Sequence, residues 1–217
     1  KTLILGGGAY SYPKYFLKKY PEATIDVVEI DEQLTELAKK HFNLKEDPRM
    51  TIYHQDGRIF LNKNEQKYDV IFGDAYNSYY SIPYQLTTVE AAQKIYDSLN
   101  EDGLILLNVI SSLEGDTCKF LRAEYRTFKE VFPQIYIYPV NHPENTSLVQ
   151  NIIMVALKSE EKPSFIDGDE EPTGFMSGDV TLFKYLDHEY TKEIPLDLPI
   201  LTDDFAPVDQ YTLEFLN

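Results

Sequence analysis

The sequence contains a single cysteine, Cys118, and only four histidines, which lie far apart along the chain. One thiol cannot form an internal disulfide, and this scarcity is typical of proteins that stay in a reducing cytosol. The pairs of Cys and closely spaced His that make zinc sites are missing as well. We therefore expect a cytoplasmic protein without a metal site, in which Cys118 is buried as packing material.

Long apolar runs and positive charge are also scarce. No run of about 18 apolar residues that would cross a bilayer occurs, and no basic start followed by an apolar stretch indicates a signal peptide. Lys and Arg number 20 against 36 Asp and Glu, which gives a net charge of −16 at pH 7. So acidic a surface repels a phosphate backbone, and we expect no nucleic-acid partner.

Short apolar segments alternate with helix-like segments along most of the 217 residues. Strands are predicted at Thr2–Leu5, Ile25–Ile30, Met50–Tyr53, Tyr68–Phe72, Leu104–Val109, Ile135–Val140 and Asn151–Leu157, and helices at Tyr12–Tyr20, Glu32–Phe42, Arg58–Leu61, Thr88–Leu99 and Thr117–Phe132. Continuous apolar strands separated by helices indicate an α/β fold with a mainly parallel, seven-stranded sheet covered on both faces. The last two strands are joined by a loop too short for a helix, so we expect an antiparallel pair at one edge.

The character of the chain changes after Lys158, where "SEEKPSFIDGDEEPTG" is rich in charge, Pro and Gly. This stretch predicts a loop, followed by a last short helical piece near Gly178–Tyr190. We expect residues 1–157 to form the catalytic domain and residues 158–217 to form a C-terminal extension that packs on it. Because the chain begins inside its first predicted strand, an upstream region is expected in the natural protein.

Three glycines, Gly6, Gly7 and Gly8, follow the first predicted strand and precede a helix. Glycine permits a tight turn here and lets backbone N–H groups approach a ligand, while the helix N-terminus adds partial positive charge. The third glycine of the dinucleotide pattern is replaced by Ser11, so a nicotinamide cofactor is disfavoured and a plain turn is the alternative.

Acidic residues end the next three predicted strands. Glu29 stands where an acid accepts hydrogen bonds from ribose hydroxyls, and Asp31 is expected to cap the following helix. Asp56 follows the third strand, where it either accepts from an adenine amino group or caps a helix. Asp74 ends the fourth strand in the crevice of the sheet, facing the reacting end of a cofactor, with a turn-forming role as the alternative.

The predicted cofactor site therefore follows the strand tips, and a loop rich in tyrosine comes after it. The cofactor-binding set is Gly6, Gly7, Gly8, Glu29, Ile30, Asp56 and Gly57. The substrate-binding set is Tyr76, Asn77 and Tyr79, from a loop that closes over a substrate or, alternatively, only packs on the surface. Glycines, ribose acid and adenine acid together favour an adenosyl cofactor.

With these residues in place, the chain resembles a known family. The segments "LILGGG", "VVEID", "HQDGRIF", "YDVIFGDAYNS" and "LTTVEAAQKIYDSLNEDGLILLNV" resemble the catalytic domain of spermidine synthases, the aminopropyltransferases of polyamine biosynthesis. "LTDDFAPVD" at Leu201–Asp209 is similar to the bacterial branch that is fused to a transporter-like membrane domain.

The resemblance implies a Rossmann-like fold of the S-adenosylmethionine-dependent methyltransferase type. It also implies decarboxylated S-adenosylmethionine as co-substrate, a small-molecule amine as acceptor, and Asp74 as the catalytic residue that removes the proton of the amine. Relatives are often homodimers, and the membrane domain would make this chain the cytosolic part of a membrane-anchored protein.

Two positions depart from the family pattern. Ala9 stands where the family has an Asp that holds the aminopropyl amine, and Asn77 stands where a second Asp holds the diamine. Ala9 leaves the form of the cofactor open, and Asn77 leaves the amine open. Two alternatives to aminopropyl transfer therefore remain: an S-adenosylmethionine-dependent methyltransferase, and a catalytically impaired nucleoside-binding module of a membrane protein.

Overall fold

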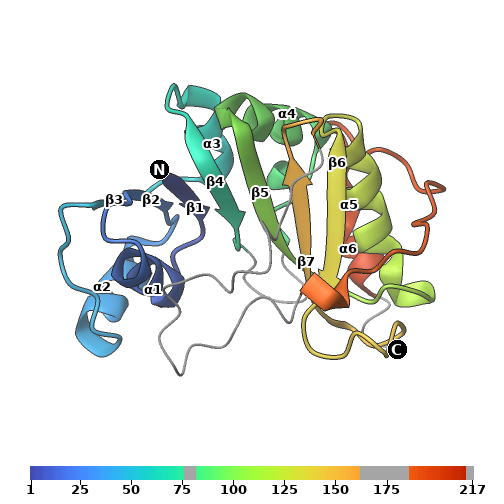
Figure 1. Cartoon of the computed structure of the whole chain (residues 1–217), viewed down its shortest axis with the longest axis horizontal. Helices are drawn as coiled ribbons and strands as arrows, with labels where there is room; N and C mark the ends of the chain where they lie inside the picture. Colours follow the sequence, from blue (N-terminus) through green and yellow to red (C-terminus); the bar gives the residue numbers. More distant parts are fainter. Residues whose placement is uncertain (76–81, 162–185, 214–217) are drawn as a thin grey trace.

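The structure, a computed structural model, describes residues 1–75, 82–161 and 186–213. Seven strands form one sheet in the order β3-β2-β1-β4-β5-β7-β6 (Figure 1). The strands are β1 (Thr2–Leu5), β2 (Ile25–Val28), β3 (Met50–Tyr53), β4 (Tyr68–Gly73), β5 (Leu99–Ser111), β6 (Gln134–Pro139) and β7 (Gln150–Leu157). The first five run parallel, and β6 and β7 form the antiparallel edge pair that the sequence predicts. The structure adds that β7 also pairs antiparallel with β5.

The order of the strands reverses at β1, which has β2 on one side and β4 on the other. Leu5 at the tip of β1 is in register with Val28 of β2 and with Gly73 of β4. In open α/β sheets the crevice at such a reversal is the usual place for a ligand. The residues that directly follow these three strand ends are therefore brought together at one edge.

Helices cover both faces of the sheet, because successive strand residues point to opposite sides. Leu3 and Leu5 pack in the larger core, with α3 (Gly57–Lys63), α4 (Val89–Ser98) and α5 (Lys119–Lys129). Ile4 packs in a second core with α1 (Ser11–Lys19) and α2 (Glu32–His41). Shorter helical segments are η1 (Tyr84–Leu86), η2 (Asp116–Cys118) and α6 (Val208–Thr212).

Several element ends differ from the prediction. The second strand stops at Val28 rather than Ile30, because the side chain of Glu29 accepts a hydrogen bond from the Asp31 amide and turns the chain into α2. The helix predicted from Thr117 opens as a 3-10 turn and becomes α-helical only at Lys119. Sequence reasoning missed α6. Of the helical piece predicted near 178–190, residues 178–185 lie outside the described residues and 186–188 form a single 3-10 turn.

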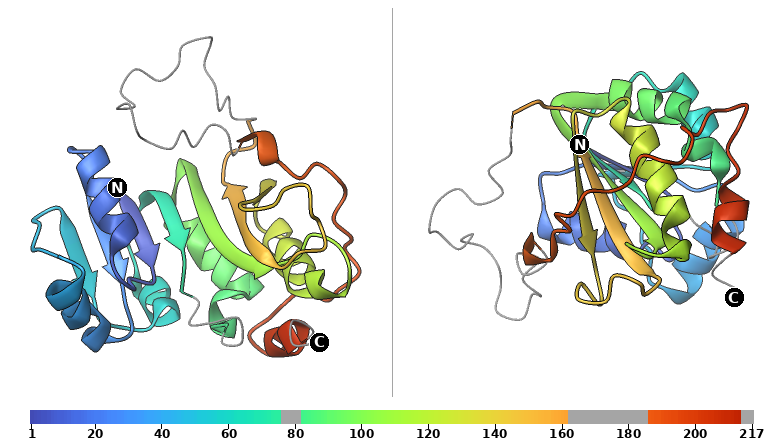
Figure 2. Two further views of the ribbon diagram at one scale, coloured as in Figure 1. Left: turned by 90° about the horizontal axis from the view of Figure 1, so that it is seen from below. Right: turned by 90° about the vertical axis from the view of Figure 1, so that its right-hand side faces the viewer.

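The C-terminal segment from residue 186 onward runs across α5 (Figure 2). Arg122 forms an ion pair with Asp197, and Arg126 donates to the carbonyl groups of Leu196 and Leu198. Val208 of α6 is buried in the larger core. This path brings "LTDDF" to the start of α4.

On the opposite face of the sheet, an apolar groove of about 860 Å³ lies between α1 and the strands β4, β5, β6 and β7. Tyr12 and Phe16 of α1 form one wall, and Leu106 and Val155 form the floor. Among the described helices, none is both long and apolar enough to cross a membrane.

Candidate functional site

A cavity of about 520 Å³ lies where the tips of β1, β2 and β4 meet the start of α3. Its size falls in the range of small-molecule sites, about 300–1,000 Å³. All of the predicted cofactor-binding set except Gly7 lines this cavity together with Asp74, namely Gly6, Gly8, Glu29, Ile30, Asp56 and Gly57. The structure therefore gathers in one place residues that the sequence spreads over nearly 70 positions.

Gly6 is the residue of the glycine turn that packs against the end of β4. Its φ is +103°, a conformation that side chains disfavour, and a Cβ atom there would lie 2.3 Å from the carbonyl oxygen of Asp74. The Gly6 amide donates to Val28 and the Asp74 amide donates to Leu5, at 2.9 Å each. No residue larger than glycine fits here without moving Asp74.

Gly7 lies directly over the ring of Tyr10, where a Cβ atom would come within 2.7 Å of Cζ. Tyr10 is fully buried, and its hydroxyl lies 2.6 Å from Oγ1 of Thr35 on α2. Burial raises the pKa of the Tyr10 phenol, so the group stays neutral. The aromatic ring thus supports the glycine turn from below.

Glu29 is 6% exposed, and its carboxylate binds three backbone amides. Oε2 accepts from Gly7 at 2.9 Å and from Gly8 at 3.0 Å, and Oε1 accepts from Asp31 at 2.9 Å. The amides of Gly7 and Gly8 therefore bind Glu29, which differs from the prediction that they approach a ligand. A carboxylate has about four lone-pair positions, so Glu29 keeps room for one further donor from the cavity.

Asp56 caps α3, which is one of the two roles that the sequence left open. Oδ1 accepts from the Ile59 amide at 2.9 Å, and Oδ2 accepts from the side chain of Gln85 at 3.2 Å. Asp31 likewise caps α2 through the Gln33 amide, as predicted. Because Asp56 also lines the cavity, capping does not remove it from the site.

Apolar side chains form the other walls of the cavity. Ile30 is 65% exposed and Leu34 is 38% exposed, although both are large and apolar. With Ile82 and Leu86 they line the cavity beside the carboxylates. An apolar wall next to a few fixed acceptors suits a flat, hydrogen-bonding ring such as a nucleobase.

Asp74 directly follows β4 and accepts a hydrogen bond from one asparagine, which in turn accepts one from a second asparagine. Asn108 of β5 donates to Oδ1 of Asp74 at 2.9 Å, and Asn151 of β7 donates to the side-chain oxygen of Asn108 at 2.9 Å. Within the described part of the chain, no donor reaches Oδ2 of Asp74. Sequence reasoning missed Asn108, although one asparagine inside the apolar "GLILLNVI" was a visible signal.

The predicted substrate-binding residues Tyr76, Asn77 and Tyr79 lie outside the described residues. The described residues on either side of them, Ala75 and Ile82, both line the cavity. Among the residues that the structure places, no group of three His, Cys, Asp or Glu is arranged to hold a metal ion.

A family model described as "Spermine/spermidine synthase domain" matches residues 1–165. A probable polyamine aminopropyl transferase of Bifidobacterium longum is 31% identical over 96% of this chain and 48% of its own length. The chain thus spans about half the length of this curated relative.

Solved structures of both expected kinds resemble the fold. A probable spermidine synthase from Corynebacterium glutamicum superimposes with a TM-score of 0.66 at 26% identity, over 76% of this chain and 58% of that one. Human methyltransferase-like protein 13, in complex with SAH, gives a TM-score of 0.61 at 22% identity, over 77% of this chain and 74% of that one. The α/β fold predicted from the sequence is confirmed.

Proposed function

The chain belongs to the spermine/spermidine synthase domain family, and from this premise we propose that it transfers an aminopropyl group from decarboxylated S-adenosylmethionine to a polyamine or related amine. The observation that carries the proposal is the position of Asp74, which lines the cavity beside the glycine turn and whose carboxylate accepts a hydrogen bond from Asn108. The similarity to a probable aminopropyl transferase over almost the whole chain supports the same chemistry.

The adenosyl part of the co-substrate is assigned to the end of the cavity formed by β2 and α3. One ribose hydroxyl donates to the remaining lone pair of Glu29, and the adenine ring lies against Ile30 with its amino group toward Asp56. The buried position of Glu29 and its three amide donors fix the carboxylate before any ligand arrives. Preorganisation of this kind lowers the cost of binding.

The aminopropyl arm then extends toward Asp74, where the acceptor amine meets it. A free alkylamine has a pKa near that of lysine, about 10.4, and therefore carries a proton that blocks attack at neutral pH. Asp74 accepts this proton through Oδ2. The nitrogen lone pair forms a bond to the carbon beside the sulfonium, the carbon–sulfur bond breaks with its electrons going to sulfur, and methylthioadenosine leaves.

We further propose that residues 158–217 pack on the domain formed by residues 1–157 instead of forming a separate unit. The contacts of the C-terminal segment with α5 support this division. Asn77 stands where the resemblance implies an Asp that holds the diamine, so the preferred amine is expected to differ from that of relatives which keep this acid. Ala9 bears instead on which form of the co-substrate is bound.

The test is product analysis on the full-length protein. With decarboxylated S-adenosylmethionine and a panel of amines, we expect methylthioadenosine and an aminopropylated amine. Asp74→Asn keeps the shape of the side chain but loses the base, and we expect a loss of about 10²- to 10⁴-fold in kcat. Asp69→Asn, on the same strand but outside the cavity lining, is the matched control.

Release of S-adenosylhomocysteine from ordinary S-adenosylmethionine would replace this proposal with methyl transfer. Nucleoside binding without any turnover would indicate an impaired module.

A further inference from the structure

The C-terminal turn formed by "LTDDF" is fixed by its backbone to two helices of the core. The Leu201 carbonyl accepts from the Val89 amide at 2.8 Å, and the Leu201 amide donates to the side chain of Thr127 at 2.9 Å. Val89 is the first residue of α4, whose amide has no acceptor within its own helix. Thr202 and Phe205 then exchange backbone hydrogen bonds and close a turn that has Asp203 and Asp204 at its tip.

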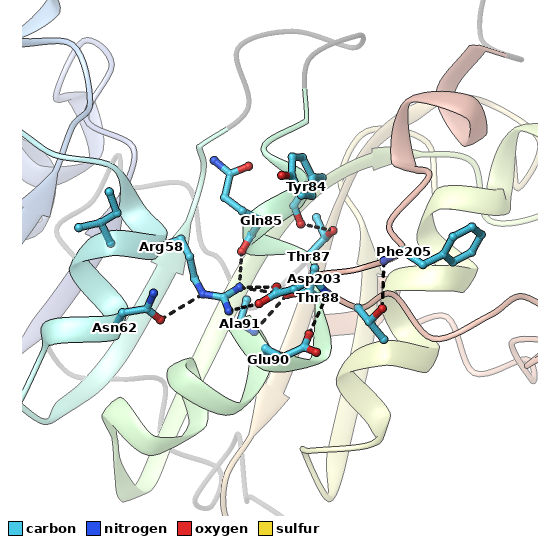
Figure 3. Close-up of polar contacts among 12 residues, drawn as sticks. Arg58, Asn62, Tyr84, Gln85, Thr87, Thr88, Glu90, Ala91, Asp203 and Phe205 are labelled. Atoms are coloured by element: carbon cyan, nitrogen blue, oxygen red, sulfur yellow. Dashed lines mark hydrogen bonds and ion pairs between the residues drawn. The ribbon is translucent and has the colours of Figure 1, made fainter.

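Asp203 pairs with Arg58, which lies 145 residues earlier in the chain (Figure 3). The two side chains form a bidentate pair, with distances of 2.9 Å from Nη1 to Oδ1 and 2.6 Å from Nη2 to Oδ2. The side chain of Arg58 is 13% exposed, so its charge is largely removed from water. Thr88 donates to the same carboxylate at 2.7 Å, and Glu90 accepts from the Asp203 amide at 3.0 Å. Fork-shaped pairs of this kind fix orientation as well as charge.

Arg58 lies next to residues of the cavity wall, although it does not line the cavity itself. It directly follows Asp56 and Gly57, which line the cavity at the start of α3, and its Nη1 donates to the backbone carbonyl of Gln85 at 2.9 Å (Figure 3). Gln85 of η1 also lines the cavity, and its side chain donates to Asp56. A single guanidinium therefore connects the C-terminal turn, α3 and η1.

We propose that Arg58 and Asp203 are positioning residues for the nucleoside end of the cavity, and that the C-terminal turn sets the distance between its α3 and η1 walls. The inference rests on the proposed function, because it assigns this end to adenosine. When Asp203 loses its charge, Arg58 keeps a largely buried charge without its carboxylate partner. The guanidinium then turns toward water and releases the Gln85 carbonyl, so the hydrogen bond from the Gln85 side chain to Asp56 is lost.

The experiment is calorimetric titration of the full-length protein with methylthioadenosine. Asp203→Asn is expected to weaken binding by about tenfold, within the usual range of coupling between sites. Asp204→Asn removes the same charge from the neighbouring, exposed position, which makes none of these contacts, and is expected to bind like the wild type. Arg58→Lys keeps the positive charge but cannot form the bidentate pair with Asp203, and its binding is expected to weaken as much as that of Asp203→Asn. In turnover, KM for the co-substrate should rise while kcat stays within about twofold, because Asp74 is untouched.

A purely stabilising pair would lower the melting temperature of Asp203→Asn and leave the dissociation constant of the folded protein unchanged, and that result overturns the inference. If Asp203→Asn does not fold, Glu90→Gln is the second variant, because it weakens the hydrogen bond that the Asp203 amide donates to the Glu90 side chain. It is expected to weaken methylthioadenosine binding by a smaller factor. Unchanged binding in that variant also overturns the inference. Wild-type protein that binds no methylthioadenosine contradicts the proposed function itself, whereas equal binding by wild type and Asp203→Asn contradicts only the role of the turn.

Discussion

Replacing Gly6 by alanine tests whether the conformation of the glycine turn determines the position of Asp74. Alanine at a φ of +103° costs at least the 1–2 kcal/mol of the left-handed region. The new Cβ would also lie 2.3 Å from the Asp74 carbonyl oxygen, far inside van der Waals contact, and such overpacking costs about 1–3 kcal/mol more. We therefore expect Gly6→Ala to lose about 2 to 5 kcal/mol of unfolding free energy.

The same substitution should reduce turnover more than its effect on stability explains. Relief of the contact requires the β4 tip to move by about 1 Å, and a misplacement of that size costs about 10²-fold in rate. Gly115 supplies the matched control, since its φ is +87° and nothing lies within 4 Å of its Cβ position. Urea unfolding measures the loss of stability of both variants, and steady-state kinetics measures their loss of turnover. Equal stability losses and equal, near wild-type rates for Gly6→Ala and Gly115→Ala would refute the reasoning.

Two further predictions concern other polar groups. Asn108→Leu removes the hydrogen-bond donor to Asp74. Because a hydrogen bond to a charged group contributes about 1.5–3 kcal/mol, we expect kcat to fall at least about tenfold with little change in co-substrate affinity. An unchanged kcat would contradict the role assigned to Asn108. Hydrogen bonds from Lys192, Thr146 and Tyr190 lower the pKa of Glu114 from 4.5 to about 2. A depressed pKa stabilises the fold above pH 4.5 and loses this effect as the pH falls toward 2, so the melting temperatures of wild type and Lys192→Met should differ most above pH 5 and converge at low pH. A difference in melting temperature that does not change with pH would show that the ion pair between Lys192 and Glu114 does not lower the pKa of Glu114.

Local patterns were sufficient for the strand tips. Gly6 and Asp74 come after strands that the sequence predicts, and Glu29 lies near the end of another. The parallel order of those strands brings the three residues together. Asp31 was predicted as a cap because capping depends on only three consecutive residues. Nearest-neighbour chemistry of this kind is visible without a structure.

The contacts that orient the site were not predictable, because they depend on register and on distant pairing. Asn108 reaches Asp74 only because β5 lies beside β4 in a particular register, and Asp203 meets Arg58 across 145 residues. The sequence also predicted free amides at Gly7 and Gly8, whereas the buried Glu29 occupies them. A carboxylate 21 residues away competes with the ligand for those donors, and no local pattern reports that competition.

The central claim is that adenosine binds at the tips of β1, β2 and β3 with the reacting carbon facing Asp74. A crystal structure of the protein with methylthioadenosine tests it most directly. The account predicts a ribose hydroxyl within hydrogen-bonding distance of Glu29, the adenine against Ile30, and the methylthio group on the side of Asp74. A nucleoside bound in the apolar groove beside α1, or one whose sulfur points away from Asp74, would contradict it.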